Sequence, residues 1–307
     1  MAEATIDVKQ RRLKKRRFQF APYALVLPAV LILIAAMGYP VGWQIYTAMH
    51  KYGLAQQFGQ PPEFVGPANF AAIFTDRTIW SVVVRSLVFC LVNACLTVVI
   101  GVLAALLMAA VGKAVRLILQ IAMLLAWATP VVAATTIWIW LFDWRRGVVN
   151  FLLTKLGFNF TNHNWLGTNL SFFGVATVIV VWMSVPFVAF SVYAGLTQVS
   201  TEVIEAANLD GANGMRRFWN IILPTVRPVL MIVILLQIIW DLRVFTQIRL
   251  LQDVQMPLDS DLLGTYIYRI GIGSSNFSMA SAVSIFILIL TIALSSFYVA
   301  HLFKEDR

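Results

Sequence analysis

Residues 196–224 read LTQVSTEVIEAANLDGANGMRRFWNIILP, a mixture of charged, small and apolar residues inside a mostly apolar chain. Ser200 or Thr201 is a suitable N-cap, because a side-chain hydroxyl can accept a hydrogen bond from a free amide at a helix start. Gly211 is a suitable stop, since glycine adopts the left-handed conformation that follows many helices. A second short helix is expected from Asn213, and Pro224 either ends it or begins the next apolar segment. The stretch therefore predicts two short helices that meet in a sharp bend.

The composition around this loop is that of a membrane protein. The 307 residues are 60% hydrophobic and 12% charged, whereas a soluble domain is about 45–50% apolar and about 25% charged. This excludes an ordinary water-soluble enzyme, and it excludes a disordered chain, which needs low hydrophobicity and high charge. Crossing ~30 Å of hydrocarbon takes about 20 apolar residues. Six segments meet this requirement, and they are 22–49, 81–110, 115–142, 171–195, 225–245 and 279–302. We therefore expect an all-α, polytopic membrane protein with about six transmembrane helices.

The basic residues indicate how the chain is oriented. The net charge is +9, and a run of lysines and arginines at 9–17 directly precedes the first apolar segment. Positive charge is enriched on the cytoplasmic side, so both termini and the loop 196–224 are expected to be cytoplasmic. The predicted organisation is a basic tail over 1–21, a transmembrane domain over 22–303 and a tail over 304–307. The first apolar segment is too long for a cleaved signal peptide.

Catalytic, metal and nucleic-acid sites are not expected. The two cysteines, Cys90 and Cys95, lie inside an apolar segment and form no CxxC motif, which favours packing residues. The three histidines, His50, His163 and His301, show no metal-ligand spacing. The basic residues gather before the first apolar segment rather than on a folded polar face, so nucleic-acid binding is not expected.

The loop resembles a known element, the EAA loop of the permease subunits of binding-protein-dependent ABC importers. The residues that carry this resemblance are Glu205-Ala206-Ala207, Asp210-Gly211-Ala212, Phe218, Ile221 and Leu223-Pro224. By composition alone the loop fits either a docking surface for another protein or an amphipathic hairpin on lipid. The resemblance favours the docking surface.

Further segments resemble the carbohydrate branch of the same family. They are Trp182-Met183-Ser184-Val185-Pro186-Phe187 with Ala194-Gly195-Leu196, then Glu63-Phe64-Val65-Gly66 with Asn69-Phe70, and Ala280-Ser281-Ala282. The second of these resembles the maltose-F, glycerol-phosphate-A and trehalose-importer type of subunit, one half of the permease pair. Two positions depart from the family: Ser200 replaces a common proline, and residues 250–257 replace an LTxGGP-like turn. The second departure leaves the binding-protein contacts and the substrate class open.

The resemblance implies a type I ABC importer permease in a bacterial plasma (inner) membrane. Its expected partners are a second homologous permease, a dimeric ATPase, an extracytoplasmic solute-binding protein, the lipid bilayer and a sugar. No GxxxxGK[ST] motif occurs, so this chain is expected to hold no cofactor and not to be an enzyme. ATP and Mg are expected to bind to the partner ATPase.

Coupling to the ATPase is assigned to eight residues by this resemblance: Glu205, Ala206, Ala207, Asp210, Gly211, Phe218, Leu223 and Pro224. Glu205 is expected to pair with an ATPase arginine, because carboxylate–guanidinium pairs are strong and directional. Gly211 supplies the bend, and the alanines permit close approach. Arg216 and Arg217 are expected to face lipid phosphate or the ATPase.

Candidates for the substrate path are polar or aromatic residues inside the apolar segments: Asn93, Trp138, Trp182, Gln237 and Trp240. Sugars bind through aromatic faces and hydrogen-bonding groups. Each candidate has a structural alternative, because tryptophans anchor helices at the membrane interface and amides form interhelical hydrogen bonds. Asp241 and Arg243 are expected near the outer rim, in a salt bridge rather than at a substrate site.

Two other functions stay open. One is an ABC permease for a different solute, such as a phosphorylated polyol, which a basic external cavity would favour. The other is a secondary carrier or channel, which requires ion-coupling carboxylates in the middle of a span.

Overall fold

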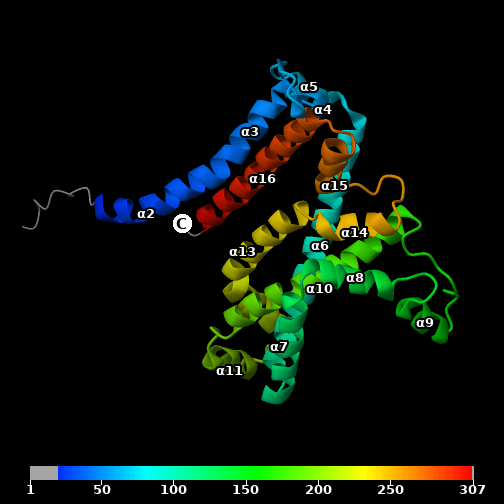
Figure 1. Ribbon diagram of the computed structural model, residues 1–307. Coiled ribbons are helices and arrows are strands. Elements are labelled where there is room, and N and C mark those ends of the chain that lie inside the picture. The colour runs from blue at the N-terminus through cyan, green and yellow to red at the C-terminus, as the bar shows by residue number, and fades with distance from the viewer. Residues whose placement is uncertain (1–19, 306–307) are drawn as a thin grey trace, which may run out of the picture.

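The computed structural model describes residues 20–305, and Figure 1 shows long helices joined by short elements. Most of the predicted basic tail 1–21 and the last two residues of the predicted tail 304–307 lie outside the described residues. The strands between residues 20 and 305 are only two residues long, His50–Lys51 (β1) and Glu63–Phe64 (β2), and they pair antiparallel. The all-α prediction is confirmed.

The predicted number of membrane crossings is also confirmed. Five helical stretches in the described chain are long and apolar enough to span a bilayer: Tyr23–Ala48, Arg77–Ala110, Asn169–Leu196, Gly214–Val254 and Phe277–Ser296. A sixth crossing results when the bent pair Lys113–Ala128 and Val131–Leu141 is counted as one.

The first crossing is interrupted by a wider helical turn. It consists of α2 (Phe20–Leu33), a π-helical turn over Ile34–Gly38 and α3 (Tyr39–Ala48). Pro40 lacks an amide proton and its ring crowds the carbonyl four residues earlier, which accounts for the wider turn. Figure 1 shows α3 beside α16 (Phe277–Glu305), and the two helices are in contact.

The centre of the protein is the pair of α6 (Arg77–Ala110) and α10 (Asn169–Leu196), which share the most extensive helix contact. These helices approach closely at Gly101. A Cβ atom added there would lie 2.6 Å from the Val188 side chain, so only glycine permits the observed spacing. Apolar residues of α10, including Phe172 and Ile179, continue the core toward the side opposite the loop 196–224.

The predicted third span over 115–142 is sharply bent. The structure has α7 (Lys113–Ala128) and α8 (Val131–Leu141), which meet at an angle of 103°. Thr129 is extended, with ψ 127°, and Pro130 follows it. A residue before proline is disfavoured in the helical conformation, and proline itself cannot continue the hydrogen-bond ladder. The bend directs α8 toward α14 (Thr246–Val254), with which it is in contact.

The fifth crossing is α13 (Leu223–Leu242), which packs against α6 and α10. Small elements cover the ends of the crossings on the side opposite the loop 196–224. They are α4 (Leu54–Gln57), α5 (Ala68–Thr75), α9 (Val148–Lys155) and α15 (Leu263–Tyr268). Here the Tyr52 amide donates to the Ser278 hydroxyl at 2.6 Å, which joins the early and late parts of the chain.

Candidate functional site

The loop 196–224 has the predicted bend. Its first half is α11 (Thr201–Leu209), and Ser200 occupies the N-cap position in an extended conformation, although its side chain makes no capping hydrogen bond. Gly211 has φ +75°, the left-handed conformation that favours glycine. The Ala212 amide donates to the Ala207 carbonyl at 2.9 Å, which closes the end of the helix.

The second half of the loop starts at Asn213 as predicted, but it does not end before the next span. A short helix α12 (Gly214–Arg217) begins at Asn213, whose side-chain oxygen accepts from the Arg216 amide at 2.9 Å. It continues through a π-helical turn over Phe218–Ile222 directly into α13. Pro224 therefore lies within continuous helix, and the wider turn before it relieves the clash of its ring with the preceding carbonyls. The loop is therefore joined to α13 by continuous helix.

The predicted coupling residues do not share one face. Glu205, Ala206, Asp210, Gly211 and Pro224 are exposed, Ala207 is buried, and Phe218 and Leu223 are half-buried. The two alanines thus face opposite ways. Glu205 lines a cavity of about 570 Å³ between the loop and the end of α6.

A contact across the bend was not foreseen from the sequence. Arg217 donates a hydrogen bond to the side-chain oxygen of Asn208, which joins α12 to α11. Arg217 therefore has a partner within the loop, and the lipid or ATPase contact expected for it stays a prediction. Only the fold brings these two residues, nine positions apart, together.

Two of the substrate-path candidates lie at one cavity. Trp138 of α8 and Trp182 of α10 meet edge to face, with ring centroids 5.8 Å apart. Both line a cavity of about 530 Å³, together with Thr177 and Pro186. Its remaining lining side chains are apolar, so the rings and the Thr177 hydroxyl are the groups that it offers to a sugar.

Trp240 lies at a second, more polar cavity of about 450 Å³. Its ring contacts Phe187 at a centroid distance of 5.0 Å. Ser184, Asp241 and Arg243 also line this cavity.

Asp241 lies in the last turn of α13, as predicted, but the predicted salt bridge is not formed among residues 20–305. The Asp241 side chain is buried, and its carboxylate accepts a hydrogen bond from the Gln237 amide at 2.9 Å. Residues two positions apart point in different directions from a helix, and Arg243 lies exposed beyond the end of α13. Asp241 instead lines the cavity that Pro130 and Val131, at the bend before α8, also line.

Asn93 and Gln237 are both fully buried. The Asn93 amide donates to the Phe89 carbonyl at 2.7 Å and to the Thr177 hydroxyl at 3.4 Å, which connects α6 with α10. Within residues 20–305, the buried side-chain oxygens that lack a hydrogen-bond partner lie on α6 and α13. They are Asn93 Oδ1, Thr97 Oγ1, Gln237 Oε1 and Asp241 Oδ2. Buried polar atoms normally have partners, so these oxygens indicate a polar interior that the protein alone does not satisfy.

The segment from α6 to α16 matches a known family. Residues 97–304 match the model of the binding-protein-dependent transport system inner membrane component. The chain belongs to this family. The resemblance seen in the sequence is thereby confirmed. The matched residues include the loop 196–224.

Curated relatives extend the match over nearly the whole chain. The diacetylchitobiose uptake system permease protein DasB of Streptomyces coelicolor is 37% identical over 96% of this chain and 90% of its own length. The trehalose/maltose transport system permease protein MalF of Thermococcus litoralis is 28% identical over 90% of this chain and 91% of its own length. These relatives are permease subunits.

A solved structure has the same fold. A chain from a bacterial ABC transporter involved in import of the acidic polysaccharide alginate superposes with a TM-score of 0.79 at 21% identity, covering 94% of this chain and 96% of that chain. The type I ABC importer permease fold is therefore confirmed for this multi-pass membrane protein.

Proposed function

We propose that this chain is the permease subunit that forms half of the translocation path for a sugar or oligosaccharide in an ATP-driven importer. The observation that carries the proposal is the 37% identity to a diacetylchitobiose uptake permease over 96% of the chain. Polar groups beside aromatic rings line the cavity at Trp240, which is a suitable arrangement for sugar hydroxyls. Asp241, Gln237 and Trp240 are the residues of α13 that we assign to this path.

The energy comes from other subunits. We assign ATP and Mg to a dimeric ATPase that docks on the loop 196–224, which we call the coupling loop. We assign the second half of the translocation path to a homologous permease. A solute-binding protein delivers the sugar on the opposite side. This assignment follows the family, since a solved importer of the same fold was captured with a periplasmic protein. It places the coupling loop and both termini in the cytoplasm.

The structure suggests how work on the loop reaches the substrate. Closure of the ATPase displaces α11 and α12 as a unit, because Arg217 ties them across the bend at Gly211. The helix is continuous from Gly214 into α13, so α13 moves with the loop. The Gln237–Asp241 pair on α13 then shifts relative to α10, which alternates access to the cavity.

Reconstitution tests this function. The chain is co-purified with its second permease and ATPase, reconstituted in liposomes with the binding protein, and assayed with labelled di- and oligosaccharides. We expect sugar-stimulated ATP hydrolysis and uptake that stops without ATP. If the importer takes up a phosphorylated polyol but no sugar, the proposed sugar substrate is wrong and a phosphorylated polyol takes its place. Ion-gradient-driven uptake by this chain alone would replace the importer with a secondary carrier.

A further inference from the structure

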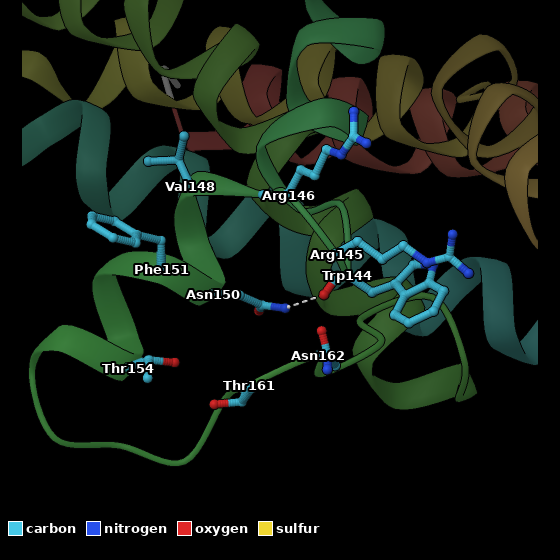
Figure 2. A pocket seen from close by; sticks show the side chains of 10 residues that line it. Trp144, Arg145, Arg146, Val148, Asn150, Phe151, Thr154, Thr161 and Asn162 are labelled. Carbon is cyan, nitrogen blue, oxygen red and sulfur yellow. Dashed lines mark hydrogen bonds between the residues drawn. The ribbon is translucent and has the colours of Figure 1, made fainter.

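A second polar cavity lies on the side of the membrane opposite the coupling loop. The connection between α8 and α10 contains α9, and the single crossing α10 separates it from the coupling loop. A cavity of about 370 Å³ opens here. Figure 2 shows that the turn 144–146, α9 and the segment 161–162 surround it. We call it the arginine pocket, defined by Trp144, Arg145, Arg146, Thr154, Thr161 and Asn162.

The arginine pocket has a rigid frame. Asn150 is 7% exposed and donates to the Trp144 carbonyl at 3.2 Å and to the His163 carbonyl at 2.9 Å, the first of which is drawn in Figure 2. Its side-chain oxygen accepts from the Trp165 indole at 2.6 Å. All hydrogen-bonding atoms of this buried amide are thus used to hold the two walls together. The walls of the pocket are therefore held in place, which lowers the ordering cost of binding.

The guanidinium groups of the pocket have no carboxylate partner among the described residues. Arg145 and Arg146 are exposed, and neither forms an ion pair within the part of the chain that the structure describes. The nearest acid in sequence, Asp143, accepts from the backbone amides of both arginines, at 3.0 and 2.7 Å. Arg145 lies 4.2 Å from the centroid of the Trp144 ring, which leaves the guanidinium edge free. The Thr154, Thr161 and Asn162 side chains make no hydrogen bond among the described residues.

An apolar patch borders the pocket. On α9 and just after it, Phe151, Leu152, Leu156 and Phe158 are 60%, 52%, 73% and 57% exposed. Exposed apolar patches of this kind mark contacts with membranes or partners, and basic residues beside aromatic and apolar ones are typical of helices at a lipid interface. A small water-soluble anion would make no use of this patch. Two adjacent arginines on the side opposite the coupling loop also run against the usual charge bias of membrane proteins.

We propose that the arginine pocket binds the headgroup of an anionic phospholipid of the phosphatidylglycerol class. The exposed Arg145 and Arg146 side chains point in different directions in Figure 2, so they turn toward the pocket when they bind the phosphate. Guanidinium groups bind phosphate oxygens in pairs of hydrogen bonds. The Thr154, Thr161 and Asn162 side chains supply hydrogen bonds for the glycerol hydroxyls, and the acyl chains lie along Phe151, Leu152 and Leu156.

Lipid titration tests the proposal. The importer complex in phosphatidylcholine nanodiscs is titrated with fluorescent phosphatidylglycerol, for wild type and for the double variant Arg145→Gln/Arg146→Gln. Each cation near an anionic headgroup contributes about 1 kcal/mol, so removal of both is expected to weaken binding about 30-fold. The control Lys51→Gln/Arg77→Gln removes two exposed charges from the same side and is expected to bind as wild type. Unchanged binding by the Arg145/Arg146 variant overturns the proposal.

Further variants and competitors distinguish a lipid site from a free-phosphate site and from a contact with the binding protein. Arg145→Lys/Arg146→Lys keeps both charges and is expected to bind more tightly than the glutamine variant, which distinguishes charge loss from misfolding. Equal competition by inorganic phosphate or by glycerol phosphate would show a free-phosphate site and would overturn the lipid assignment. Weaker docking of the binding protein to the glutamine variant, with lipid binding unchanged, would assign the pocket to that protein instead.

Discussion

The Gln237 side-chain amide donates a 2.9 Å hydrogen bond to the Asp241 carboxylate one turn further along α13, and both side chains are buried. The pair lies on the helix that continues directly from the coupling loop. Each side chain retains one buried oxygen without a protein partner. Each of these oxygens can accept a hydrogen bond from a separate hydroxyl group of a sugar.

Replacement of Asp241 by alanine leaves the buried Gln237 amide unpaired, at a cost of about 1–3 kcal/mol. If the same free energy is lost from the transport step, uptake is expected to fall about 5- to 150-fold, while the protein still assembles. Asp241→Asn keeps an acceptor and is expected to retain more uptake than the alanine variant. The measurement is uptake of labelled sugar in liposomes, with Asp253→Ala, an exposed residue, as the control. Wild-type uptake by Asp241→Ala would remove Asp241 from the path.

Gly211→Val places a β-branched residue at φ +75°, a conformation that costs such a residue about 1–3 kcal/mol. The bend between α11 and α12 is expected to change, and transport is expected to be lost while the permease remains in the membrane. Gly112→Val is the matched control, since Gly112 has φ −64° and open space around its Cα. Equal uptake by the two variants would argue against a role for the bend.

Glu205→Lys reverses an exposed charge on α11 and leaves the buried face of that helix unchanged. If Glu205 pairs with an ATPase arginine, the variant is expected to lose co-purification with the ATPase and sugar-stimulated ATP hydrolysis. Glu63→Lys, an equally exposed reversal on the other side, serves as the control. Normal ATPase retention by Glu205→Lys would contradict the contact.

Asn208→Ala and Arg217→Ala each break the hydrogen bond across the bend. Both positions are largely outside the core, so each change is expected to alter stability by less than about 1 kcal/mol. Coupling of ATP hydrolysis to uptake is expected to weaken in both, and the double variant is expected to resemble the single ones because they share one interaction. Additive losses in a double-mutant cycle would show that the two residues act separately.

Gly101→Leu drives a side chain into Val188, where even a Cβ atom would come within 2.6 Å. Overpacking of a core contact costs about 1–3 kcal/mol. The expected result is a lower melting temperature in detergent, with partial rescue by Val188→Ala. Gly174→Leu, at a position with open space, is the control and is expected to melt as wild type. A Gly101→Leu protein with an unchanged melting temperature would show that α6 and α10 can move apart without loss of stability.

Several features of the site were outside the reach of sequence reasoning. The Gly211 bend followed from a local conformational preference, and it was predicted correctly. The continuity of α12 with α13 was missed, because a proline is tolerated in a helix that widens its turn before it. The Asp241 environment was missed for a different reason. Its depth was inferred from distance along one helix, whereas burial depends on the neighbouring helices that surround it.

Local and compositional properties were settled by the sequence alone: the membrane class, about six crossings, the bend at Gly211 and the family carried by the residues around it. These depend on hydropathy and on backbone preferences, which each residue carries with it. Contacts between distant residues were decided only by the tertiary structure. Helix packing pairs Arg217 with Asn208, buries Asp241 and frames the arginine pocket around Asn150. Such contacts depend on helix directions that no local pattern encodes, most clearly on the 103° bend between α7 and α8.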